Sequence, residues 1–100
     1  MYIIIGNKND SRLYEISKKL SNSIVVHNYC KLKNLNTYCN IIIPYELILL
    51  NGFINNTEIS LDELLLQLRV IKIVYGNVNN SEVIKRFSKD YHIKTEFFKF

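Results

Sequence analysis

The sequence predicts an α/β domain with a mainly parallel sheet of about five strands, in a Rossmann-like or flavodoxin-like three-layer arrangement. Short aliphatic runs alternate along the chain with segments whose apolar residues recur at helical spacing. The runs are unbroken rather than interleaved with polar residues, which is typical of parallel strands covered on both faces. A length of 100 residues fits one compact core, so we expect a single domain over residues 1–100.

Five segments are the expected strands. Four of them are short, rich in β-branched residues and followed by a turn former, whereas in the last one polar and aromatic residues alternate. They are Tyr2–Ile5, Ile24–Val26, Ile41–Ile43, Val70–Tyr75 and His92–Phe98. Alternation suits a half-buried strand, so the last one is expected at an edge of the sheet.

Three helices are expected between these strands. The first begins at Asp10 or Ser11, and its apolar face is Leu13, Ile16 and Leu20. The second begins at Ser60, which with Glu63 has the capping-box spacing that satisfies two backbone donors. The third follows possible caps at Asn79 and Asn80, and its apolar face is Val83, Ile84, Phe87 and Tyr91. Residues 31–40 are too short and too polar to predict a crossover helix, and residues 47–57 fit a helix, a hairpin or a loop equally.

Composition and charge exclude several classes of protein. The aliphatic runs are far shorter than the roughly 20 residues that span a bilayer, and no basic leader precedes the first one. We therefore expect a soluble, cytoplasmic chain with no membrane partner. The net charge of +4 comes from residues 69–100, where seven Lys or Arg stand against three Asp or Glu. A solvated helix face explains these charges, so nucleic acid is not an expected partner.

Metal and disulfide chemistry are not expected either. Cys30 and Cys39 are the only cysteines, and in a reducing compartment such a pair usually consists of two small apolar side chains. Their spacing to His27 and His92 matches no zinc-binding pattern. His27 follows the second strand, where it is either a general base or, as we favour, a polar residue at a strand end.

Turn residues after three of the strands are the weak candidates for a substrate site. Ligands of open parallel sheets bind beyond the carboxyl ends of the strands, so these segments should converge. The candidates are Gly6, Asn7, Asp10, Pro44, Glu46, Gly76 and Asn77. Two interpretations stay open. In the first, the glycines let the backbone approach a ligand and the amides and carboxylates bind it; in the second, all are ordinary turn residues.

Short catalytic and nucleotide-binding motifs are missing. The turn after the first strand has Gly6 alone instead of a glycine triplet, and Asp10 would compete with a phosphate for the helix start. P-loop, Gly-x-Ser-x-Gly and HExxH patterns are also absent. We expect no cofactor in this chain and no catalytic residue.

In order and spacing, several segments resemble the N-terminal domain of the oxidoreductase subunit of dipicolinate synthase. They are Ile4-Ile5-Gly6, Asp10-Ser11-Arg12, Asn40-Ile41-Ile42-Ile43-Pro44, Ile59–Leu65, Ile73-Val74-Tyr75-Gly76 and His92-Ile93-Lys94. The resemblance covers nearly the whole chain. The sequence departs from the family at Asn7-Lys8-Asn9, which lengthen the first turn, and at Leu47–Phe53.

The resemblance implies an accessory domain of an oxidoreductase that makes dipicolinate during sporulation. The family's NADP-binding domain is absent here, so this segment would contribute to the substrate cleft or to assembly without being catalytic alone. Asp10, Arg12, Pro44 and Gly76 are the matching positions, and Arg12 would bind a small dicarboxylate through its bidentate fork. Implied partners are the second, flavoprotein-like subunit of dipicolinate synthase and a second copy of this chain. The alternative is a stand-alone binding or protein-interaction module.

Overall fold

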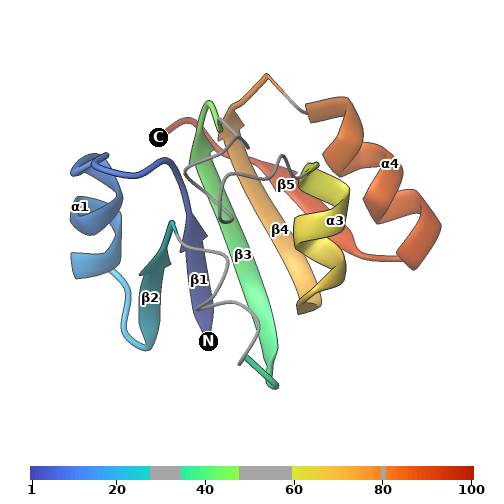
Figure 1. Ribbon diagram of the computed structural model, residues 1–100, viewed down its shortest axis with the longest axis horizontal. Coiled ribbons are helices and arrows are strands. Elements are labelled where there is room, and N and C mark those ends of the chain that lie inside the picture. Colours follow the sequence, from blue (N-terminus) through green and yellow to red (C-terminus); the bar gives the residue numbers. More distant parts are fainter. Residues whose placement is uncertain (28–34, 48–59, 80) are drawn as a thin grey trace.

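A computed structural model describes residues 1–27, 35–47, 60–79 and 81–100. Its elements follow the β-α-β, then β-α-β-α-β order that the sequence predicts (Figure 1). The strands are β1 (Tyr2–Ile5), β2 (Ser23–Val26), β3 (Tyr38–Tyr45), β4 (Arg69–Asn77) and β5 (Lys94–Phe97). The helices are α1 (Arg12–Lys18), α3 (Leu61–Leu66) and α4 (Ser81–Tyr91).

The five strands form one sheet in the order β2-β1-β3-β4-β5, and every neighbouring pair is parallel. This is the flavodoxin-like order, and it confirms the predicted fold class. β2 lies on one side of β1 in the sheet, and β3, β4 and β5 follow on its other side. Right-handed crossovers therefore place α1 on one face of the sheet and α3 and α4 on the opposite face.

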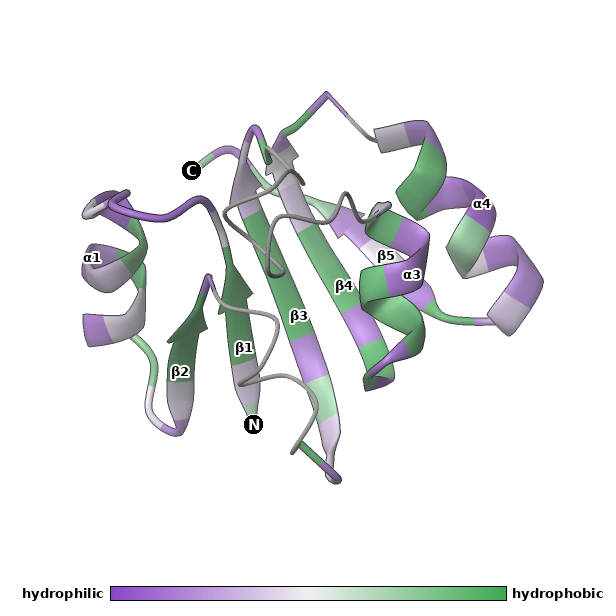
Figure 2. Cartoon of the chain, in the orientation of Figure 1, coloured by the Kyte–Doolittle hydropathy of each residue, from purple (hydrophilic) through white to green (hydrophobic). Residues whose placement is uncertain are grey.

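The two faces are covered unequally. On the α3/α4 face, Ile3, Ile41, Ile43 and Ile73 join both helices in one large buried cluster. On the α1 face the buried cluster consists of Ile4, Leu13 and Ile42. Apolar colour is concentrated in β1 and in the parts of β3 and β4 beside it, whereas apolar and polar residues alternate along α4 (Figure 2). The expectation of strands covered on both faces thus holds on one side, while Val74 of β4 stays half-buried on the other.

Local sequence explains how the helices begin and end. The Ser60 hydroxyl accepts a hydrogen bond from the Glu63 backbone N–H, which is the predicted cap of α3. This bond also helps to order the first turn, and a hydrogen bond from Ser60 lowers the pKa of Asp62. Asn79 instead donates its amide to the Glu46 carboxylate at 3.4 Å, and Asn80 lies outside the described residues.

Other sequence expectations have mixed outcomes. Cys39 is buried and free, and burial raises the pKa of its thiol, whereas Cys30 lies outside the described residues. Residues 31–34 and 48–57 lie outside them too, while the described part of the first uncertain segment ends in Tyr38, Cys39 and Asn40 of β3. Within the part of the chain that the structure covers, no helix is long and apolar enough to cross a membrane.

Candidate functional site

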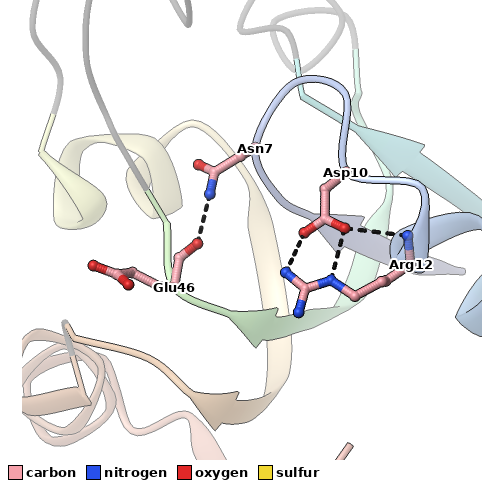
Figure 3. Close-up of polar contacts among 4 residues, drawn as sticks. All are labelled: Asn7, Asp10, Arg12 and Glu46. Carbon is pink, nitrogen blue, oxygen red and sulfur yellow. Dashed lines mark hydrogen bonds and ion pairs between the residues drawn. The ribbon is translucent and has the colours of Figure 1, made fainter.

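The carboxyl ends of β1, β3 and β4 bring most of the predicted site residues to one edge of the sheet. The Asn7 amide donates a hydrogen bond to the Glu46 main-chain carbonyl oxygen at 2.6 Å, which ties the turn after β1 to the end of β3 (Figure 3). Asn77 pairs in register with Tyr45 and is exposed. These contacts hold the turns to one another, while a role in binding substrate stays a prediction.

Both glycines of this edge face protein atoms. A Cβ on Gly6 would lie 2.7 Å from Cδ2 of Leu13, and a Cβ on Gly76 would overlap the Pro44 carbonyl oxygen. Neither glycine has a positive φ. Their small size therefore serves internal packing, in which Leu13 closes over β1 and the end of β3 approaches β4.

Asp10 and Arg12 form a bidentate ion pair at the start of α1. The Asp10 carboxylate accepts from Nε of Arg12 at 2.9 Å and from Nη2 at 2.7 Å, and it also caps the Arg12 backbone N–H at 3.1 Å (Figure 3). The same guanidinium lies 3.8 Å from the centre of the Tyr45 ring, a cation–π distance. Arg12 is thus fixed in place by an anion from its own chain.

This pair predicts a pH effect. Hydrogen bonds from Arg12 lower the pKa of Asp10, so the folded-state pKa lies below the unfolded one. Its contribution to stability is present above the unfolded pKa and is lost as pH falls through the folded pKa. In a carboxyl-carbon NMR titration, Arg12→Ala should raise the Asp10 midpoint. An unchanged midpoint would show that the pair does not persist in solution.

A groove of about 580 Å³ lies on the α1 face, beside these residues. Its apolar lining comes from three places that are distant in sequence: α1 and the turn after it, the centres of β3 and β4, and the residues after β5. These residues are Ile16, Leu20, Ile42, Val74, Phe98 and Phe100. Arg12 and Tyr45 stand in its wall, together with Glu15, Lys19 and Lys99. A concave apolar surface with a few charged groups is typical of a binding site.

Aromatic contacts fix the wall opposite α1. The Phe98 backbone N–H donates to the Tyr75 carbonyl oxygen at 2.9 Å, which extends the attachment of the chain end to β4. The Phe98 and Phe100 rings meet edge to face at 4.9 Å, and Phe100 meets Tyr45 at 6.3 Å. Of the groove residues, only Arg12 is an expected binding residue, through the family resemblance, and Phe98 is expected in an edge strand.

The remaining candidates do not assemble into a second site. The Tyr14 hydroxyl lies 3.4 Å from Nε2 of His27, at the end of β2. Among the described residues, no three metal-ligating side chains are grouped to hold an ion. The fold is therefore that of an α/β domain of flavodoxin-like topology, and its described residues form an apolar groove on the α1 face. Comparison with known proteins gave no match to a family model, a curated protein or a solved structure.

Proposed function

We propose that this chain is a binding module without catalysis of its own, and that its ligand lies in the groove on the α1 face. The groove itself is the observation that carries the proposal, because it combines a large apolar surface with charged walls. The polar residues of the neighbouring edge are engaged with each other, as Asp10 is with Arg12, which suits a structural role better than a chemical one.

A second candidate is an accessory domain of an oxidoreductase similar to dipicolinate synthase. Its support is Arg12, whose side chain is 61% exposed at the groove wall although it is paired with Asp10. In that setting, NADP would bind to another domain, and Arg12 would contact the dicarboxylate. Calorimetric titration with dipicolinate tests this directly. Binding that becomes weaker in Arg12→Ala favours this candidate, and the absence of a binding signal excludes an autonomous dicarboxylate site.

The binding-module proposal predicts that the native chain enhances the fluorescence of anilinonaphthalene sulfonate, an apolar anionic dye. Val74→Asp should abolish most of this enhancement, because it places a carboxylate on the apolar floor and repels the sulfonate of the dye. Ile71→Asp is the matched control, since Ile71 lies on the same strand, is 52% exposed and does not line the groove. Far-UV circular dichroism checks that both variants fold. Equal dye binding by both variants would remove the groove as the site.

A further inference from the structure

Resting on the proposed function, we infer that the occupant of the groove is an amphipathic α-helix of another polypeptide, with carboxylate side chains along its borders. Three features of the α1 face support such an occupant: the part of the sheet that helices leave open, the apolar groove floor, and the charges at the rim.

The way in which helices cover the sheet indicates which kind of element fits the groove. α1 packs on β1 and β2, at one side of the sheet. Ile42 of β3 is buried in the cluster that Leu13 of α1 joins, whereas no described helix covers Val74 of β4 on this face. Parallel sheets of α/β proteins bury both faces under helices. A helix lying beside α1 would complete that layer over Ile42 and Val74, which form the floor.

The floor also argues against an extended peptide. It is the side-chain surface of the central strands, whose backbone groups are already paired within the sheet. A strand joins a sheet at an open edge, where backbone groups are free, and gains little on a face. A helix instead presents apolar side chains at i, i+3, i+4 and i+7 to a surface of this kind.

The sheet restricts how far the occupant reaches. On the same face, the ion pair of Lys72 and Glu96 at 2.7 Å borders the apolar floor, because Glu96 pairs in register with Val74 and Lys72 lies two residues before Val74 on β4. Along α1, Arg12 and Lys19 are separated by about 10 Å at 1.5 Å per residue. The apolar stripe of the occupant thus spans about two helical turns.

Charges at the groove rim indicate which side chains should flank the apolar stripe of that helix. Glu15 is paired with Lys18 and Arg12 with Asp10. Lys19 on the α1 side and Lys99 on the opposite wall form no ion pair with any residue that the structure describes. The rim therefore carries two uncompensated positive charges, one on each side, which carboxylates on both borders of a helix would meet.

A second copy of this chain fits less well. The chain carries a net charge of +4, so two copies repel each other. Its longest described helix, α4, exposes Lys85, Arg86 and Lys89 against Glu82 and Asp90, so its outer face is basic on balance. An acidic helix from a different polypeptide satisfies both the apolar floor and the basic rim.

The test is a fluorescence-anisotropy titration of the full chain with labelled synthetic peptides of about 14 residues, near the minimum length for a helix in water. One peptide has leucine at i, i+3, i+4 and i+7 with flanking glutamates, and the control has lysine for each glutamate. We expect the acidic peptide to bind, and the basic one to bind about tenfold more weakly at low salt. Lys19→Glu with Lys99→Glu should reverse this preference, and added salt should reduce it.

Each other outcome counts against the inference in a distinct way. Equal binding of both peptides would overturn the acidic border. Failure of both peptides, while the dye still binds the chain but not Val74→Asp, would overturn the helix and leave the groove intact as a binding site. Loss of dye binding as well would remove the proposed function itself. Concentration-dependent dimerisation that Val74→Asp abolishes would replace the foreign helix with a second copy.

Discussion

Ile43→Ala is expected to destabilise the domain by about 2–5 kcal/mol, the usual cost of removing a large aliphatic side chain from a core. Ile43 lies in β3, is fully buried and joins the cluster beneath α3 and α4. Because helices and neighbouring strands enclose it, the space left by the lost atoms cannot be reached by solvent and closes only in part. Urea denaturation followed by circular dichroism measures the loss, with an unchanged slope as the sign of two-state behaviour.

The adjacent residue supplies the matched control. Ile42 points to the opposite face, where it is 5% exposed and forms part of the groove floor. Ile42→Ala should cost clearly less, because the removed atoms border a groove that is already open and no enclosed cavity forms. Equal costs at both positions would mean that the α1 face is as tightly covered as the other, and would contradict the unequal layers on which the binding site depends.

The strands were predictable because apolar runs are a local signal, and their ends were less so. β1 coincides with the predicted Tyr2–Ile5, but β3 extends from Tyr38 to Tyr45, beyond the predicted Ile41–Ile43. Ladder hydrogen bonds use the backbone, so pairing continues through polar residues where hydropathy gives no indication. A register shift beside Cys39 and Asn40 leaves Ile71 of β4 outside the pairing, which explains why an isoleucine within an apolar run is exposed.

The groove was not predictable from local patterns. Ile16 and Leu20 have the spacing of an ordinary core-facing helix, and nothing in α1 alone indicates that part of this face stays open. The opening follows from the strand order, which places α1 over β1 and β2 and leaves β3 and β4 to the far side. Strand order depends on contacts between distant segments, so a site built on it appears only once the chain is folded.

Gly76→Ala is the second change with a large expected effect, about 1–3 kcal/mol of lost stability as in an overpacked core. The new Cβ would overlap the Pro44 carbonyl oxygen and lie 2.7 Å from Cδ2 of Phe100. The oxygen belongs to the backbone of β3 and has no rotamer to escape into. Relief therefore requires β3 and β4 to separate at their carboxyl ends, and it displaces Phe100 from the groove wall.

Gly6→Ala is the informative comparison for Gly76→Ala. At Gly6 the new methyl group meets the end of the Leu13 side chain, which can shift by rotation, so the loss should be smaller than at Gly76. Asn77→Ala, at an exposed position, should change stability by no more than about 0.5 kcal/mol. Measured by urea denaturation, this order would assign both glycines to packing. If Gly76→Ala were instead neutral for stability yet weakened dipicolinate binding, the glycine would act at a ligand site, and the substrate-cleft interpretation would gain over the groove.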